Sequence, residues 1–250
     1  MPVRAVFLDV GWTLAYPQRS IWEIFSDICR EFGVDVAPER CESVIGTLRR
    51  DLHAHQEASL REGASSRDSD AELGGGFAQM GEVVLGHFGV DAPAAEFNRR
   101  FLSAFWTEGN WRAFPDTLEA IDLLKQRGAR VGVLSNAPTN LPAFLAQLGI
   151  APRLDFAVVS ASEGFRKPDR RIFARAVERA GVAPEDAIHV GDMYLEDVLG
   201  GRAAGVRPLL IERGEHSLFP SFPESHGRDV APGDVVRNLH DVIERYDSFA

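Results

Sequence analysis

Five short apolar runs, separated by segments with a helical pattern, most constrain what this chain can fold into. The runs cover Ala5–Leu8, Val131–Leu134, Phe156–Val159, Ala187–Val190 and Pro208–Ile211. Short apolar runs without polar alternation are typical of strands that are buried on both faces. Strands that alternate with helices along one chain predict a parallel sheet with right-handed crossovers. We therefore expect an α/β fold with a doubly wound parallel sheet.

A long helical block separates the first run from the other four. Apolar residues recur at spacings of three and four across 20–32, 38–60, 77–88 and 93–106, whereas 61–76 is polar and predicts a loop. Within the last helical segment, Phe97, Phe101 and Phe105 form an aromatic face that we expect to be core. The simplest organisation is an α/β core of residues 1–15 and 113–250 with an all-helical cap of residues 16–112 and no strand within it.

Helical patterns also separate the later runs. They cover 115–127, 141–148, 169–180 and 196–204. After the last run, 214–233 is polar and contains proline, which predicts a loop. Residues 235–246 predict a closing helix.

Composition excludes several classes of partner. The formal net charge is −10, which argues against nucleic acid or an anionic membrane as the main partner. No apolar run approaches the length that spans a bilayer, and the first strand begins too early for a signal peptide. The two cysteines, Cys29 and Cys41, are too few for a disulfide framework and predict reduced core thiols in a cytoplasmic protein.

Polar residues follow four of the predicted strands. They are Asp9 with Thr13, Ser135 with Asn136, Ser160 with the later Lys167, and Asp192 with Asp197. Each alone is compatible with a helix cap, a turn or a solvated charge. The carboxyl ends of parallel strands meet at one edge of the sheet, where open α/β sheets bind their ligands. The four pairs together therefore favour a functional site at that edge.

This order of motifs resembles the haloacid dehalogenase superfamily of hydrolases, in the branch with a helical cap after the first motif. The matching segments are VLSNA at 133–137, RKPDRRIF at 166–173 and HVGDMYLED at 189–197, together with the Asp9 segment. The resemblance covers both core segments and the position of the insert. It implies a Rossmann-like core with the first strand central. It also implies a magnesium-dependent hydrolase that forms an aspartyl-phosphate.

The resemblance implies a nucleophile and a metal site. Asp9 would attack phosphorus, because a carboxylate can split hydrolysis into two easier steps. Mg²⁺ would be held by Asp9, Asp192 and the backbone carbonyl of Gly11, since this ion prefers oxygen ligands and lets two anions approach. Asp197 would support these ligands from outside the coordination sphere.

The resemblance also implies a phosphate site. Ser135 and Asn136, at the start of the following helix, would hold phosphate oxygens through a hydroxyl group and backbone N–H groups. Lys167 would bind both Asp9 and the transferring group as a point charge. Thr13 would orient Asp9 or the phosphate. The substrate would be a small phosphorylated molecule selected by the cap, and the sequence indicates neither its identity nor the oligomeric state.

One position departs from the family pattern. Gly11 stands where family phosphatases usually carry the aspartate that protonates the leaving group. A positioned acid typically contributes about 10²–10⁴-fold to the rate. Nucleophile, metal and positive clamp supply most of the catalysis in phosphoryl transfer. We therefore expect an enzyme that favours good leaving groups. His53 and His55 in the cap could supply a proton on closure, but they receive no assigned role.

Three alternatives remain open at this point. Dehalogenases of the superfamily also lack the acid, but they use no magnesium and lack the paired acids that Asp192 and Asp197 supply here. Phosphonate hydrolases of the superfamily need a cap lysine, and residues 16–112 contain none. The third alternative is a member without turnover that binds a phosphorylated ligand or a protein.

Overall fold

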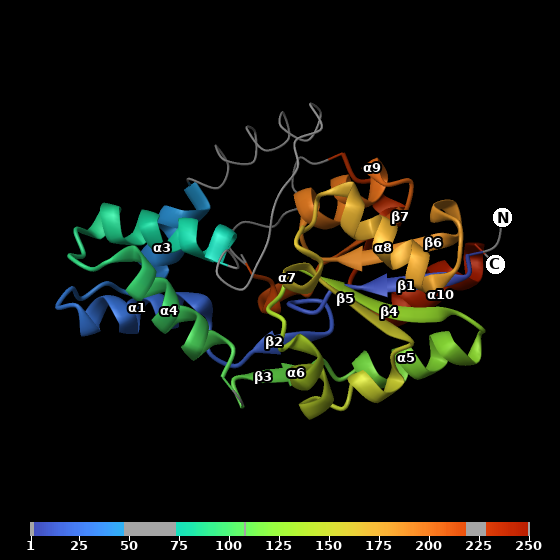
Figure 1. Cartoon of the computed structure of the whole chain (residues 1–250), viewed down its shortest axis with the longest axis horizontal. Coiled ribbons are helices and arrows are strands. Elements are labelled where there is room, and N and C mark those ends of the chain that lie inside the picture. The colour runs from blue at the N-terminus through green and yellow to red at the C-terminus, as the bar shows by residue number, and fades with distance from the viewer. Residues whose placement is uncertain (1–2, 48–73, 108, 219–228, 250) are drawn as a thin grey trace. The chain divides into compact units, whose positions relative to one another are not determined.

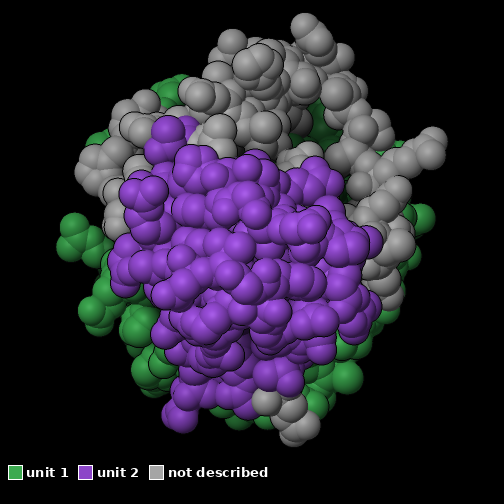
Figure 2. All heavy atoms as spheres, turned by 90° about the vertical axis from the view of Figure 1, so that its left-hand side faces the viewer, with its two compact units in different colours: residues 1–16, 63–69, 113–250 green, residues 17–62, 70–112 purple. Residues whose placement is uncertain are grey.

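A computed structural model describes residues 3–47, 74–107, 109–218 and 229–249, without the side chains of 74–80. The described chain divides into two compact units, which Figure 2 distinguishes by colour. The first unit contains residues 3–16 and 113–249, and the second contains residues 17–47 and 74–112. None of the helices in these residues combines the length and the apolar character that crossing a membrane requires.

A six-stranded parallel sheet forms the centre of the first unit (Figure 1). Its order is β5 (Phe156–Val159), β4 (Arg130–Ser135), β1 (Ala5–Leu8), β6 (Ala187–Gly191), β7 (Arg207–Ile211) and β8 (Val235–Val236). In register, Leu8 lies opposite Val133 of β4 and Val190 of β6, and all four residues of β1 are fully buried. The predictions of a doubly wound parallel sheet and of a central first strand are confirmed.

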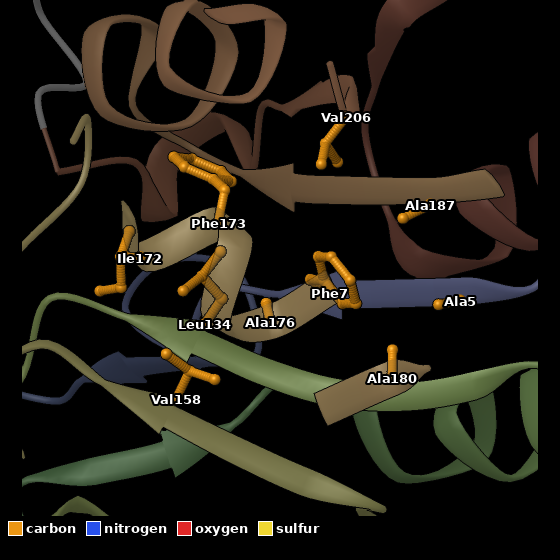
Figure 3. Close-up of a cluster of buried hydrophobic side chains, with 10 residues drawn as sticks. All are labelled: Ala5, Phe7, Leu134, Val158, Ile172, Phe173, Ala176, Ala180, Ala187 and Val206. Atoms are coloured by element: carbon orange, nitrogen blue, oxygen red, sulfur yellow. The ribbon is translucent and has the colours of Figure 1, made fainter. Parts of the chain in front are cut away.

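Helices cover both faces of this sheet (Figure 1). On one face lie α8 (Arg170–Ala180) and α9 (Gly200–Ala203), and on the other lie α5 (Thr117–Gln126) and α10 (Leu239–Phe249). Helix α8 begins where the Asp169 side chain accepts a hydrogen bond from the Arg171 N–H, and it ends at Gly181 with φ +67°. Its apolar face carries Phe173, which lies with Phe7 and Leu134 in one buried cluster (Figure 3).

Four further short elements of the first unit connect its strands and helices. They are α6 (Leu141–Gln147), η1 (Ala151–Arg153), α7 (Ser160–Glu163) and η2 (Pro184–Asp186). After β6 the chain forms a π-helical segment, η3 (Tyr194–Leu199), which runs directly into α9. The helix predicted at 196–204 is therefore present as two consecutive pieces.

The second unit is built from α1 (Ile21–Glu31), a helix at 38–47, α3 (Gly74–Phe88) and α4 (Ala94–Phe105). Ser20 begins α1 with a capping box, and Gly33 follows its end with φ +80°. The Phe25 ring stacks on Phe97 and Phe101 at centroid distances of 5.6 and 4.6 Å. The aromatic face of α4 is therefore core, as predicted.

Both cysteines are free and buried in the second unit. Burial raises the pKa of the Cys29 thiol to about 11 and that of the Cys41 thiol to about 12. The prediction of core thiols is confirmed.

Several short elements differ from the prediction. Strands β2 (Ala15–Pro17) and β3 (Trp111–Ala113) pair with each other at the two ends of the segment predicted as strand-free. Helix α3 begins at Gly74, within the predicted loop, and the rest of that loop lies outside the described residues. β8 occupies the start of the predicted last helix, and η4 (Gly214–His216) and η5 (Pro232–Asp234) lie in the predicted final loop. These elements have two or three residues, too few for a periodic pattern, apart from the extra turn of α3.

Candidate active site

Asp9 follows β1 directly and stays attached to the sheet. Its N–H donates to the Val190 carbonyl at 2.9 Å, which extends the β1–β6 ladder past the end of β1. The side chain is buried, and one carboxylate oxygen lies 2.9 Å from the Lys167 ammonium nitrogen. The central position of β1 therefore presents this carboxylate at the carboxyl edge of the sheet.

A tight turn follows Asp9. The Val10 carbonyl accepts hydrogen bonds from the N–H groups of Leu14 and Ala15, both at 2.9 Å, and Trp12 N–H donates to the Ala15 carbonyl at 2.7 Å. Trp12 has φ +52°, in the left-handed region that favours glycine, whereas Gly11 has no positive φ. The bulky residue, not the glycine, therefore carries the unfavourable backbone conformation of this turn.

Thr13 and Arg213 join this turn to the end of the sheet. Thr13 is fully buried, and its hydroxyl has no hydrogen-bond partner among the described residues. Its carbonyl accepts a hydrogen bond from the Arg213 guanidinium at 2.7 Å, and Arg213 also forms a 2.8 Å ion pair with Asp116. Arg213 has no predicted role, and 200 positions separate it from Thr13. It holds the backbone of the turn and leaves the Thr13 hydroxyl free for another partner.

Lys167 lies between two carboxylates. Its ammonium nitrogen is 2.9 Å from Asp9 Oδ1 and 2.6 Å from Asp197 Oδ1, and its side chain is 2% exposed. Burial alone would lower the pKa of Lys167, but the charges of Asp197 and Asp9 outweigh it and raise the pKa above its usual range. The lysine is thus a permanent positive charge in contact with Asp9.

Asp197 lies in η3 and uses both carboxylate oxygens inside the protein. Oδ1 accepts from Lys167 and from His189 Nε2 at 2.8 Å, and Oδ2 accepts from the Met193 N–H at 2.9 Å. Burial would raise the pKa of Asp197, but the Lys167 charge and the His189 hydrogen bond hold it well below its usual range. His189 has no predicted role, although a histidine inside an apolar strand pattern is the signal that could have singled it out.

Ser135 is the last residue of β4 and is buried, and Asn136 follows it. The Asn136 side chain makes two hydrogen bonds to the backbone of Lys167: its amide donates to the carbonyl at 3.0 Å and its oxygen accepts from the N–H at 2.8 Å. The prediction that these residues start the next helix is wrong, because α6 begins at Leu141. Pro138 accounts for the difference, since the residue before a proline avoids the helical conformation.

Three carboxylates gather at this edge of the sheet. Asp192 follows β6, the neighbour of β1, and oxygens of Asp9, Asp192 and Asp197 all lie within 4.8 Å of one another. Against these three acids, the cluster contains one ammonium group, that of Lys167. An all-oxygen donor set with this charge suits a divalent cation of the magnesium type.

The structure therefore brings Asp9, Lys167, Asp192 and Asp197 together, and Asn136 joins them through Lys167. Thr13 is connected to Asp9 by the turn, and Ser135 ends the strand beside β1. At Gly11 the turn offers backbone groups and no side-chain acid.

Comparisons with known proteins point to one family. The model of the haloacid dehalogenase-like hydrolases matches residues 4–205. The chain is 36% identical over 236 residues to haloacid dehalogenase-like hydrolase domain-containing protein 3 of Xenopus laevis, covering 90% of this chain and 91% of the relative. It is 31% identical over 250 residues to glyceraldehyde 3-phosphate phosphatase of Methanopyrus kandleri, covering 95% of this chain and 98% of the relative.

A solved structure, a predicted phosphoglycolate phosphatase from Haemophilus somnus, superimposes with a TM-score of 0.71 over 97% of both chains. Its sequence identity is 14%, so it bears on the fold alone. The family match over most of the chain and the two relatives show that the chain belongs to the haloacid dehalogenase-like hydrolases.

Proposed function

We propose that this chain is a phosphatase that hydrolyses a small phosphorylated metabolite, with Asp9 as the nucleophile. The observation that carries the proposal is the contact between Asp9 and Lys167 inside a cluster of three acids. The names of relatives support the same class of reaction, since they include a glyceraldehyde 3-phosphate phosphatase and a phosphoserine phosphatase.

Asp9 and Asp192 are the side chains that would hold Mg²⁺, together with the Gly11 carbonyl. Asp197 belongs to the same cluster, but Lys167, His189 and the Met193 N–H already occupy its oxygens. Its role in the proposal is therefore to hold Lys167 beside the metal site. When bound, the ion would neutralise the phosphate oxygens and let an anionic substrate approach Asp9.

The reaction begins at the Asp9 carboxylate. One of its oxygens attacks phosphorus, the bond from phosphorus to the leaving oxygen breaks, and an acyl phosphate forms on Asp9. Water then attacks this phosphate, and inorganic phosphate leaves with the Asp9 carboxylate restored. Lys167 lies beside Asp9 and stabilises the charge on the transferring group in both steps.

Phosphate oxygens need donors that the fold does not already use. The Thr13 hydroxyl is such a group, because it is buried and has no partner among the described residues. The Ser135 hydroxyl and the Asn136 N–H are proposed as further donors. The Asn136 side chain is excluded from this role because it already binds the Lys167 backbone.

The proton for the leaving group would come from solvent in this chain. Gly11 has no acidic side chain, and His53 and His55 lie outside the described residues. A leaving group that is stable as an anion needs no proton, so aryl and acyl phosphates should react well and alkyl phosphates poorly. We further propose residues 16–112 as the cap that selects the substrate and residues 1–15 and 113–250 as the catalytic core.

The test is hydrolysis of p-nitrophenyl phosphate by the whole chain, with Mg²⁺ or with a chelator, for the wild type and for Asp9→Asn. We expect turnover that requires both the metal and Asp9. Asp186→Asn is the matched control, because Asp186 is equally buried but precedes β6 at the opposite edge of the sheet. Wild-type turnover that survives in Asp9→Asn would refute the mechanism.

Chloride release from a 2-chloro acid is measured in parallel. Halide release without metal and without phosphatase activity would favour the dehalogenase reaction. Inactivity on every compound would favour a binding protein.

A further inference from the structure

His189 is a buried polar residue that the mechanism above does not use. It lies in the middle of β6, in register between Phe7 of β1 and Pro208 of β7, and its side chain has no exposed surface. Its ring makes an edge-to-face contact with Phe173 at a centroid distance of 5.2 Å. An imidazole buried among apolar side chains is costly unless it makes hydrogen bonds. An aliphatic residue would serve the strand equally well, so the imidazole calls for a specific role.

The polar contact of this imidazole is with Asp197. His189 Nε2 lies 2.8 Å from Asp197 Oδ1, while Nδ1 has no hydrogen-bond partner among the described residues. Because an ionised carboxylate can only accept, the hydrogen must reside on Nε2. A second hydrogen on Nδ1 would be a buried donor without an acceptor. The geometry therefore assigns the Nε2–H of His189 as the donor to Asp197.

Oδ1 of Asp197 is also the oxygen that holds Lys167. The ammonium nitrogen is 2.6 Å from this oxygen and 2.9 Å from Asp9 Oδ1. The His189 hydrogen on Oδ1 and the Met193 N–H on Oδ2 together fix the rotation of the carboxylate. Without the hydrogen on Oδ1, the carboxylate could turn about its Cβ–Cγ bond, and the lysine could follow it away from Asp9.

We infer that His189 is a positioning residue for the reaction proposed above: it holds Oδ1 of Asp197, and through that oxygen it keeps the Lys167 ammonium beside Asp9. The inference rests on the proposed function for its effect on catalysis. The placement of Lys167 itself can be tested without substrate or metal.

Three variants distinguish the effect of the hydrogen bond from the effect of packing around the ring. His189→Leu removes the donor and keeps an apolar side chain, His189→Gln restores an N–H donor, and Phe173→Leu disturbs the packing around the ring without touching the hydrogen bond. With p-nitrophenyl phosphate and Mg²⁺, we expect kcat of His189→Leu to fall about 10- to 100-fold, as for other outer partners of active-site ligands. KM should change far less. His189→Gln should recover most of kcat, and Phe173→Leu should stay close to the wild type.

A spectroscopic measurement follows the lysine directly. The chain contains two lysines, Lys125 and Lys167, so selective ¹⁵N labelling of lysine gives two side-chain signals. Lys167 is buried, whereas Lys125 is 36% exposed and pairs with Asp155 far from His189 in the sequence. In His189→Leu we expect the Lys167 signal to shift and to exchange faster with water, while the Lys125 signal stays unchanged.

The outcomes separate cleanly. The inference is overturned if the Lys167 signal does not move in His189→Leu. It is also overturned if Phe173→Leu lowers kcat as much as His189→Leu does, or if kcat of His189→Gln is no higher than that of His189→Leu. If His189→Leu does not fold, the alternative test is to determine which ring nitrogen of wild-type His189 carries the hydrogen. A hydrogen on Nδ1 rather than Nε2 contradicts the assigned geometry. If Asp9→Asn retains activity, the proposed function fails, but the lysine signals still test the placement of Lys167.

Discussion

The carboxylate of Asp197 occupies the space that a side chain on Gly191 would need. A Cβ atom at Gly191 would lie 2.1 Å from Asp197 Cγ and 2.2 Å from Oδ2. Gly191 is the last residue of β6, so the sheet ends in a gap into which Asp197 fits. The absence of a side chain at this position is therefore part of the arrangement that holds Lys167.

Gly191→Ala should push Asp197 away from Lys167. Overpacking of this kind costs about 1–3 kcal/mol of unfolding free energy, and kcat should fall about 10- to 100-fold because a partner of an active-site group moves. Gly201→Ala is the control, since its Cβ would meet Pro208 at an ordinary 3.4 Å. Urea unfolding and hydrolysis of p-nitrophenyl phosphate measure the two effects. Full activity in Gly191→Ala would show that Asp197 can move without consequence.

Asp197→Asn should lower stability with a defined pH dependence. The ordinary pKa values are 3.8 for Asp and 10.5 for Lys, and the fold lowers the pKa of Asp197 and raises that of Lys167. The lowered carboxyl pKa contributes stability above about pH 4, which is lost as the pH falls toward the folded-state pKa. The raised ammonium pKa contributes stability below about pH 10, which is lost as the pH rises toward the folded-state pKa.

The free-energy difference between wild type and Asp197→Asn should therefore be flat from about pH 5 to 9 and shrink in stronger acid. Its size should be about 3 kcal/mol, at the lower end for a broken buried pair because Asp9 still compensates Lys167. Urea unfolding across this pH range measures it. A difference that changes steadily between pH 5 and 9 would contradict the assignment of the charges.

Thr13→Val should separate stability from activity. The substitution keeps the shape of the side chain and removes a buried hydroxyl without a partner, so unfolding free energy should stay constant or rise by about 1 kcal/mol. If the hydroxyl serves phosphate, kcat/KM should fall about 10- to 100-fold, the value of one hydrogen bond to a charged group.

Thr117→Val is the matched control for Thr13→Val. The Thr117 hydroxyl is equally buried but donates to the Leu14 carbonyl at 2.7 Å. Its loss should lower stability by about 1 kcal/mol because a buried hydrogen bond is removed, although the Leu14 carbonyl keeps the one from the Phe114 N–H. Activity corrected for the folded fraction should change little. Equal behaviour of the two variants would contradict the proposed role of Thr13.

Mg²⁺ should stabilise the folded chain in the absence of substrate. The cluster brings oxygens of three carboxylates within 4.8 Å of one another, and an ion that binds only the folded state adds about 2.7 kcal/mol at one hundred times its Kd. Thermal unfolding with increasing Mg²⁺ should show a rising Tm in the wild type. The rise should be much smaller in Asp192→Asn and normal in Asp122→Asn, whose half-exposed side chain pairs with Arg153.

Gly11→Asp should extend the range of leaving groups. Gly11 has no positive φ, so its backbone conformation does not require glycine. If the new carboxyl group protonates the leaving oxygen, turnover of an alkyl phosphate such as glycerol phosphate should rise about 10- to 100-fold, within the range for general acids. Turnover of p-nitrophenyl phosphate should change little. Gly11→Asn supplies the same shape without an acid, and an equal gain in that variant would point to another cause.

Continuous apolar runs and periodic patterns predict their elements well in this chain. Strand β1 and helix α8 appear where the sequence places them, because four apolar residues and a capped amphipathic face leave few alternatives. The short strands β2, β3 and β8 leave no such pattern. Their pairing depends on contacts between distant segments, as when Trp111–Ala113 pairs with Ala15–Pro17.

The polar strand ends predict which residues gather at the site, and the order of strands explains why they meet. Asp9 and Asp192 come together because β1 and β6 are neighbours, which the family resemblance implies and local patterns do not. His189 and Arg213 escape prediction for a different reason. His189 contacts the Asp197 side chain, Arg213 contacts the Thr13 carbonyl and Asp116, and no spacing rule encodes such bonds.

The Arg213 hydrogen bond to Thr13 also bears on how variation in this chain should be interpreted. The match to the family model ends at residue 205, and Arg213, which supports the turn after Asp9, lies beyond it. Substitutions in this C-terminal stretch can thus alter the presentation of Asp9 while every recognisable motif stays intact. A variant of this kind, judged by its motif residues alone, would be expected to be active. Two members of the family with identical motifs can differ in rate because of residues outside them.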